Sequence, residues 1–226
     1  MKRLFLFSAM LIAAAAVAWP GTAKTSIRTP VELTDDAAGA QTLEVRLPRA
    51  NLEVVGGPGT EVRVFGSLEA LHKNGEMARA LAQACGAAFR REGTTLVLEP
   101  RFPEGEVGRE ARKRGRLWFH LRLEVPSTLP IGLYTKAGDM AFKGEFLASL
   151  IAEAGRGDIR LDFVPTFREL DARTLLGRVR GFPDTAIRRF YSPLGQRRLW
   201  LNPSGTRMGF LKTQRGDIIV QGKDRP

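Results

Sequence analysis

The sequence predicts an all-β fold, a β-solenoid built from coils of about 20 residues. Three observations predict it. A glycine recurs with spacings of 19, 20, 18 and 21 residues at Gly138, Gly157, Gly177, Gly195 and Gly216. Apolar residues alternate with period two on both sides of these glycines, which is the strand pattern. Three of the glycines are followed by Asp, and a Gly-Asp pair favours a tight corner between two strands.

Aligned on the glycine, the repeats form columns of like residues. The residues five positions before the glycine are all apolar, and those three positions before it are all small: Leu133, Ala152, Ala172, Phe190 and Leu211, then Thr135, Ala154, Thr174, Ser192 and Thr213. The positions two and four after the glycine are predicted to point inward, and they hold Met140, Ile159, Val179, Arg197 and Ile218, then Phe142, Leu161, Gly181, Leu199 and Val220. A coil of this kind buries its apolar side by stacking on copies of itself, about 4.8 Å apart.

The N-terminal half shows shorter strand patterns around residues 43–47, 52–54, 62–65, 95–98 and 117–125. An Ala- and Leu-rich run between them predicts a short helix over about residues 75–90. The charged, glycine-containing stretch over about residues 104–116 is predicted to be a basic loop. We therefore assign residues 24–226 to one β-solenoid domain with this helix and loop inserted.

The first 23 residues are typical of a secretory signal peptide. Lys2 and Arg3 precede an apolar run over residues 4–18, which is too short for a comfortable transmembrane helix. We expect cleavage after Ala23, with Ala18 as the other candidate, and an uncleaved anchor is the alternative. No later segment is long and apolar enough to span a membrane, so the mature chain is expected to be exported.

The order of these elements resembles the bacterial putative-adhesin family of exported β-solenoid domains, a domain-of-unknown-function family. The matching segments are residues 121–126 (LRLEVP), residues 133–139 (LYTKAGD) and the Gly-Asp-Ile turns at residues 157–159 and 216–218. The resemblance implies a right-handed, single-stranded β-helix, a location in the periplasm or at the cell surface of a bacterium, and no established enzymatic activity. This chain departs from the pattern at Gly177-Arg178 and Gly195-Gln196, where the Asp is lost.

The composition argues against cofactor chemistry. The chain has 35 Lys and Arg against 24 Asp and Glu, a formal net charge of +11 that is concentrated in the C-terminal half. The single cysteine, Cys85, excludes an internal disulfide; a buried inert thiol is the main interpretation and an intermolecular disulfide the other. His72 and His120 leave little for a zinc site or a triad. We expect no catalytic residue, no metal ligand and no cofactor.

One candidate binding surface stands out on the repeat. Arg160, Arg180 and Arg198 each lie three positions after a corner glycine, so they are predicted to stack on successive coils. Phe182 and Trp200 flank them. Arginine forks suit phosphate or carboxylate, and aromatic faces suit sugar rings. This arginine strip is predicted to bind an anionic polysaccharide or a phosphorylated glycolipid of the cell envelope; the alternative is a solvated, arginine-rich face.

Other patterns leave further alternatives open. Asp139, Asp158 and Asp217 share a column, which suits either turn chemistry or a calcium or acid–base site. The basic residues of the loop suit acidic lipids or nucleic acid, or simple solvation, and no nucleic-acid partner is expected. The main function predicted is therefore a non-catalytic, adhesin-like envelope module. The alternatives are a structural protein that self-associates through the solenoid ends into filaments, and a carbohydrate-active β-helix enzyme.

Overall fold

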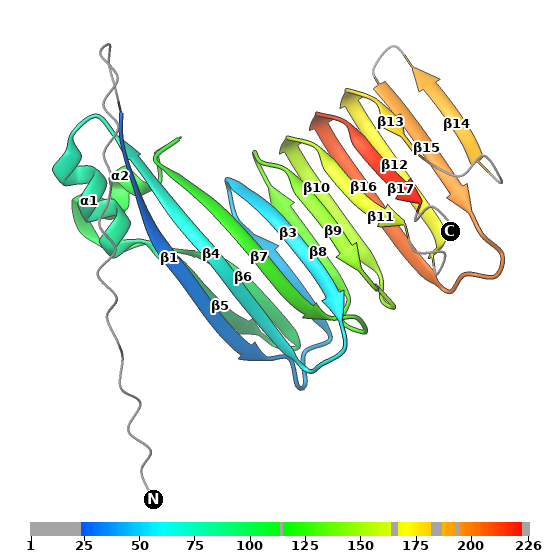
Figure 1. The fold of residues 1–226 in the computed structure, drawn as a ribbon, viewed down its shortest axis with the longest axis horizontal. Coiled ribbons are helices and arrows are strands. Elements are labelled where there is room, and N and C mark those ends of the chain that lie inside the picture. The colour runs from blue at the N-terminus through cyan, green and yellow to red at the C-terminus, as the bar shows by residue number, and fades with distance from the viewer. Residues whose placement is uncertain (1–23, 114, 164–166, 182–186, 193–194, 223–226) are drawn as a thin grey trace, which may run out of the picture.

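The fold is all-β, as predicted, and consists of two stacked sheets (Figure 1). It is seen in a computed structural model that describes residues 24–113, 115–163, 167–181, 187–192 and 195–222. The sheets run along the long axis of the molecule, and two short helices lie at the end that holds the N-terminal strands. The predicted signal peptide lies outside the described residues.

The first sheet has eight strands and the second has nine. In spatial order the first holds β1 (Thr25–Asp36), β4 (Glu61–His72), β7 (Leu117–Pro126), β3 (Ala50–Gly57), β9 (Met140–Gly144), β11 (Ile159–Phe163), β17 (Ile218–Gly222) and β13 (Val179–Arg180). The second holds β14 (Ile187–Ser192), β15 (Gly195–Leu201), β12 (Phe167–Leu176), β16 (Arg207–Arg215), β10 (Leu150–Arg156), β8 (Ile131–Thr135), β2 (Thr42–Arg46), β6 (Thr95–Arg101) and β5 (Gly86–Glu92).

Both sheets share a parallel core in which the chain passes repeatedly from the second sheet to the first. Each pass is called a coil below and consists of a strand, a corner and a strand: β2–β3, β8–β9, β10–β11, β12–β13 and β16–β17. Parallel ladders join neighbouring coils in both sheets. The predicted inward column after the glycine is buried in these coils, with no more than 1% exposure at Met140, Ile159, Val179 and Ile218.

The predicted stacking of the coils in sequence order is wrong. Strand β16 pairs with both β10 and β12, and β17 pairs with both β11 and β13. The last coil of the chain is therefore inserted between β10–β11 and β12–β13, and the corner glycines follow the spatial order Gly138, Gly157, Gly216 and Gly177. Because every copy presents the same apolar columns, the repeat itself does not specify which copies become neighbours.

The predicted single-stranded solenoid is also wrong, because the sheets are mixed. Gly195 does not form a corner; it begins β15, which pairs antiparallel with β14 and β12. Residues 193 and 194 alone separate β14 from β15, and a parallel connection needs a much longer crossover. At the other end, β4 pairs antiparallel with β1 and β7, and β5 pairs antiparallel with β6.

The corner glycines are required by the close approach of neighbouring coils. Gly138, Gly157 and Gly216 have φ angles of 124°, 128° and 143°. A Cβ atom on any of them would lie within 2.2 Å of a backbone oxygen of the adjacent coil. Real Cβ atoms do not approach an oxygen so closely, so only glycine allows the corners to stack at this spacing.

A ladder of side-chain hydrogen bonds links the same corners. Each polar residue after the corner uses its Oδ1 atom to accept a hydrogen bond from a backbone amide of the next coil. The ladder runs from Asn51 to the Asp139 amide (3.1 Å), from Asp139 to that of Asp158 (2.8 Å), from Asp158 to that of Asp217 (2.8 Å), and from Asp217 to that of Arg178 (2.8 Å). The carboxylates were predicted to serve turns within their own coil; here they join one coil to the next.

Arg197 was predicted to point into the core, but it lies on the outer face of the second sheet. There Asp171, which is 5% exposed, accepts hydrogen bonds from Arg197 Nε at 2.9 Å and from Arg173 Nε at 3.0 Å. Burial alone would raise the pKa of Asp171, but the hydrogen bonds from Arg173 and Arg197 outweigh it and hold the pKa below its usual value. Antiparallel pairing in β15 thus gives Arg197 a partner on the outer face.

The inserted segments are more structured than predicted. Helix α1 (Gly75–Ala84) begins at Asn74, whose side chain accepts from the Glu76 amide at 2.8 Å. It ends before the predicted boundary near residue 90, because residues from Gly86 onward pair with β6 as strand β5. The predicted basic loop contains helix α2 (Gly105–Ala111). Cys85, which follows α1, is buried, and burial raises the pKa of its thiol.

We expect the substitution Gly157→Ala to lower the free energy of unfolding by about 3 kcal/mol, because it combines a strained φ with a steric clash against the adjacent corner. Gly93→Ala is the matched control, since Gly93 also has a positive φ but nothing lies within 4 Å of the added Cβ. Chemical denaturation measures both. Equal losses for the two variants would contradict the stacking explanation.

We expect Asp171→Asn to lower the free energy of unfolding by about 1–2 kcal/mol near neutral pH, since both arginine partners are partly exposed and screened. A depressed pKa in the folded state gives stability that is present above the ordinary pKa and lost as pH falls through the folded value. The difference between wild type and variant should therefore be constant above about pH 5 and shrink below about pH 4. Denaturation curves across this range test it; a difference that persists in acid would contradict it.

Candidate functional site

The structure separates the three arginines of the predicted strip. Arg160 on β11 and Arg180 on β13 pair with Ile219 from opposite sides of β17, so a complete coil lies between them. Arg198 lies in the other sheet, on β15. The predicted stack on successive coils is therefore wrong, because the spatial order of the coils differs from their order in the sequence.

Of the two aromatic residues of the strip, Trp200 does not supply an open ring face. Trp200 is 6% exposed and belongs to the buried core. Phe182 lies outside the described residues. Ligand binding by the strip residues stays a prediction, and a different surface has the convergent charge that the strip lacks.

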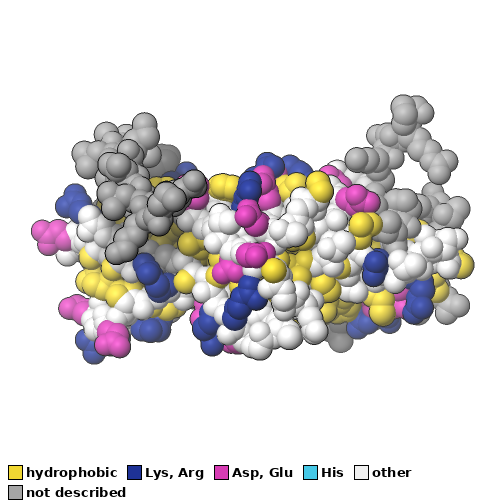
Figure 2. All heavy atoms as spheres, turned by 90° about the horizontal axis from the view of Figure 1, so that it is seen from below, with side chains coloured by type: hydrophobic (Ala, Val, Ile, Leu, Met, Phe, Trp, Pro, Cys, Tyr) yellow, Lys and Arg dark blue, Asp and Glu magenta, His cyan; other side chains and the backbone are white. Residues whose placement is uncertain are grey.

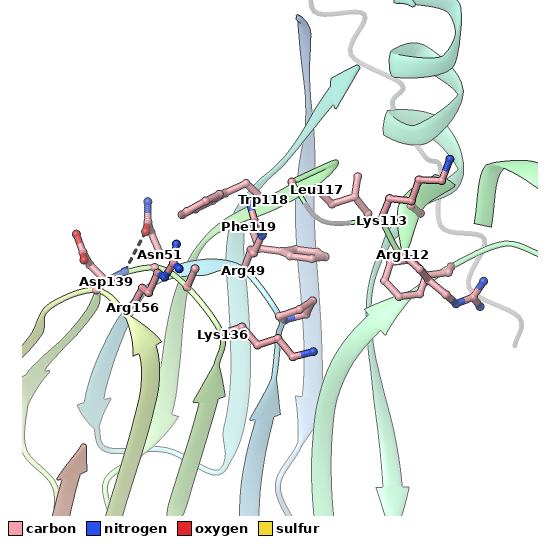
Figure 3. Close-up of a pocket in the computed structure, with 17 residues that line it drawn as sticks. Arg49, Asn51, Arg112, Lys113, Leu117, Trp118, Phe119, Lys136, Asp139 and Arg156 are labelled. Atoms are coloured by element: carbon pink, nitrogen blue, oxygen red, sulfur yellow. Dashed lines mark hydrogen bonds between the residues drawn. The ribbon is translucent and has the colours of Figure 1, made fainter. Parts of the chain in front are cut away.

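A pocket of about 950 Å³ lies at the edge of the molecule formed by the corners (Figure 3). Strand β7 and helix α2 line one side of it, and the corners after β2, β8 and β10 line the other. Five basic side chains and one carboxylate line it: Arg49, Arg112, Lys113, Lys136, Arg156 and Asp139. On the opposite edge, where β3 ends, basic and acidic side chains are interspersed instead (Figure 2).

Three of these cations come from consecutive corners. Arg49 forms a parallel bridge with Ala137, and the amide of the following Gly138 donates to the Arg156 carbonyl at 2.8 Å. Arg49, Lys136 and Arg156 therefore belong to three neighbouring coils with a rise of about 4.8 Å each. The side chain of Lys136 extends towards the side of the pocket that holds Arg112 and Lys113 (Figure 3). The corner geometry thus brings together cations that lie far apart in the sequence.

The carboxylate in the lining is already used by the fold. Asp139 accepts a hydrogen bond from the Asp158 amide, and its own amide donates to Asn51 (Figure 3). Its carboxylate points away from Arg49, Lys136 and Arg156. The middle of the pocket therefore keeps a clear excess of positive charge, which favours an anionic ligand.

Trp118 on β7 lines the same pocket. The guanidinium carbon of Arg49 lies 5.6 Å from the centroid of the indole, which is within cation–π distance. The guanidinium therefore covers one face of the ring. The indole Nε1 atom is buried and has no hydrogen-bond acceptor among the described residues. A buried donor without an acceptor costs free energy, and such groups are often completed by a bound molecule. The pocket is thus rich in donors and poor in acceptors.

His120 is held by hydrogen bonds next to this pocket. The Asn51 side chain gives its oxygen to the Asp139 amide, so its Nδ2 atom donates to His120 Nδ1 at 3.3 Å. The imidazole proton then lies on Nε2 and faces Glu69 Oε2 at 3.2 Å. Burial alone would raise the pKa of Glu69, but hydrogen bonds from Ser26 and His120 hold it below its usual value. These contacts give His120 a structural role.

The α2 side of the pocket is held by a buried carboxylate. Glu110 lies 2.7 Å from Arg116 Nε, 2.5 Å from Lys113 Nζ and 3.2 Å from His72 Nε2. The hydrogen bond from Lys113 is the main reason that the pKa of Glu110 lies below its usual value. Arg112 instead places its guanidinium carbon 5.2 Å from the ring centroid of Phe102. The basic residues Arg112, Lys113 and Arg116 therefore help to dock α2 on the strands.

The sequence analysis missed Arg49, Lys136 and Arg156 as site residues. The prediction rested on the columns five and three positions before each glycine and on those after it, whereas these cations lie one or two positions before the corner. The signal was present, because Lys136, Arg156 and Arg215 stand one or two residues before three of the corner glycines. Trp118 had no signal beyond its place on an alternating strand.

Two further features concern other classes of site. Among the described residues, no group of three or more His, Cys, Asp or Glu side chains is arranged to hold a metal ion. In the same part of the chain, no helix has the length and hydropathy needed to cross a membrane.

No protein-family model matches the chain, and no curated protein is significantly similar to it. Two solved structures are similar. A putative cell adhesion protein from Clostridium sporogenes ATCC 15579 is 10% identical with a TM-score of 0.44, and the match covers 86% of this chain and 100% of that one. A putative adhesin from Bacteroides fragilis NCTC 9343 is 9% identical with a TM-score of 0.28, over 85% of this chain and 97% of that one. These values are too low to transfer a fold or a function.

We expect Glu110→Gln to loosen α2, because the neutral amide no longer neutralises Lys113 and Arg116. Amide hydrogen exchange in α2 should become faster, while exchange in β10 stays unchanged. Glu106→Gln is the control, since Glu106 is exposed on the same helix. Equal exchange in the wild type and in Glu110→Gln would show that this carboxylate does not hold α2.

Proposed function

We propose that the protein is an exported, non-catalytic, adhesin-like module of the bacterial cell envelope that binds an anionic envelope polymer in the corner pocket. The observation that carries the proposal is the convergence of Arg49, Lys136 and Arg156 from consecutive coils. Export is supported by the signal-peptide pattern of the first 23 residues. The adhesin-like role is supported by the sequence resemblance given above.

The electrostatics of the pocket favour an anion. Unit charges about 5 Å apart repel by roughly 1 kcal/mol even in water, and by more beside a protein surface. Among the described residues, neither Lys136 nor Arg156 has a carboxylate within 4.0 Å. A bound anion would relieve the repulsion. The fold thus fixes the backbone positions from which the cations extend before a ligand arrives, which reduces the cost of binding.

The contents of the pocket are those of a binding site. Glycoside hydrolysis generally needs two carboxylates facing the scissile bond. The lining holds Asp139, whose Oδ1 atom is engaged by the neighbouring coil. The arrangement therefore supports retention of an anionic polymer. The enzymatic and filament-forming alternatives stay predictions.

We expect the double variant Lys136→Ala/Arg156→Ala to bind polygalacturonate or heparin at least tenfold more weakly than the wild type, since each cation contributes about 1 kcal/mol. The matched control is Arg79→Ala/Arg207→Ala, which removes two exposed cations, one on α1 and one at the far end of β16 from its corner. Calorimetry or biolayer interferometry at several salt concentrations measures the affinities.

Both polymers should bind the wild type more weakly as salt rises, and a neutral dextran should not bind. Failure of both anionic polymers to bind the wild type, or an equal loss in the two double variants, would overturn the proposed function.

A further inference from the structure

We propose that the pocket is one end of a longer binding track, and that its ligand is a linear acidic polysaccharide lying along the stacking axis with one sugar residue per coil. This inference rests on the proposed function and deepens it by naming the class and direction of the ligand. The track is formed by cations at four corners that are consecutive in space: Arg49, Lys136, Arg156 and Arg215.

The strand register places Arg215 next in line after the pocket. Arg156 at the end of β10 pairs directly with Arg215 at the end of β16, and the Gly157 amide donates to the Arg215 carbonyl at 2.8 Å. Arg215 is exposed and does not line the pocket itself. The four cations therefore extend over three coil intervals, or about 14 Å.

This track exists only because of the observed coil order. In sequence order the coil of Gly177 would follow that of Gly157, and it carries Leu176 where the coils of Gly157 and Gly216 carry arginine. The insertion of β16–β17 places Arg215 beside Arg156 instead. Arg156 and Arg215 therefore lie side by side, and they are different residues from the three arginines that were predicted to stack.

Among the described residues, neighbouring carboxylates do not pair directly with three of the four cations of the track. In the described parts of the chain, Lys136, Arg156 and Arg215 have no carboxylate within 4.0 Å. Asp158 and Asp217 use their Oδ1 atoms to hold the next coil. Asp217 also pairs with Arg180 on the side away from the track. A row of anions along the cations is thus the partner that the geometry lacks.

The spacing favours a polysaccharide with an acidic group on each sugar. A pyranose residue in an extended chain is about as long as the coil rise of about 4.8 Å, so the sugar repeat stays in step with the corners over a few residues. Phosphates of one DNA strand advance by about 3.4 Å of helix axis per base pair and wind around that axis, so they do not follow a straight row of corners. Single-stranded nucleic acids need aromatic stacking platforms, whereas Arg49 and Arg112 already cover faces of Trp118 and Phe102.

The test measures the binding of oligogalacturonates of increasing length by calorimetry at constant low salt. Wild-type affinity should rise at least tenfold from the disaccharide to the tetrasaccharide and then level off, since four corners carry cations. Arg215→Ala should weaken tetrasaccharide binding threefold to tenfold while leaving the disaccharide in the pocket unaffected. Arg207→Ala, at the other end of the same strand, is the control and should change neither.

The outcomes separate this inference from the proposed function. If Lys136→Ala/Arg156→Ala weakens binding but affinity does not depend on length, or Arg215→Ala has no effect, the pocket stands and the track is refuted. If oligothymidylate of equal charge binds as tightly as the tetrasaccharide, the polysaccharide class is refuted. If no oligogalacturonate binds the wild type, both are refuted. Arg215→Gln serves as a second variant, and circular dichroism melting checks the fold of each.

Discussion

The close stacking of the corners is the constraint on which the rest of the structure depends. Each corner glycine lies against a backbone oxygen of the neighbouring coil, so no side chain fits between them. The residue after the glycine then reaches across to the next amide, as Asp139 and Asp158 do. Steric contact and hydrogen bonding therefore set the same spacing, and the apolar columns of both sheets meet in register.

That spacing also creates the candidate site. Residues just before the glycine cannot enter the corner, so long polar side chains there project outward at the edge of the molecule. When Lys136 and Arg156 occupy these positions on adjacent coils, the fold itself holds like charges together. Backbone ladders supply the free energy that opposes their repulsion, and the buried Glu110 docks α2 on the other side of the pocket. The candidate site thus results from the stacking of the corners combined with basic residues at the positions just before the glycines.

Different levels of the structure were predictable to different extents. The period of about 20 residues and the inward columns follow from local alternation, and they are confirmed at Met140 and Ile159. The segment at Gly195 carries the same local pattern yet forms an antiparallel hairpin, because its partner strand lies only two residues upstream. Arg197 stands in a column that is otherwise apolar. In the folded chain its side chain lies on the outer face instead, where it donates a hydrogen bond to Asp171. The departure at Gly195 and Arg197 marked the hairpin, whereas the coil of Gly216 follows the repeat and still stacks out of sequence order.

The sequence by itself determined that the chain is all-β, that corners lie at Gly138, Gly157, Gly177 and Gly216, and that apolar columns beside them form the core, because these depend on contacts between residues close in the chain. The tertiary structure decided the order of the coils, the mixed character of the sheets and the membership of the site. Every coil offers equivalent apolar faces, so the choice of neighbour depends on the length of the connections and on the fit of the whole stack. Arg156 and Arg215 become neighbours only through that choice.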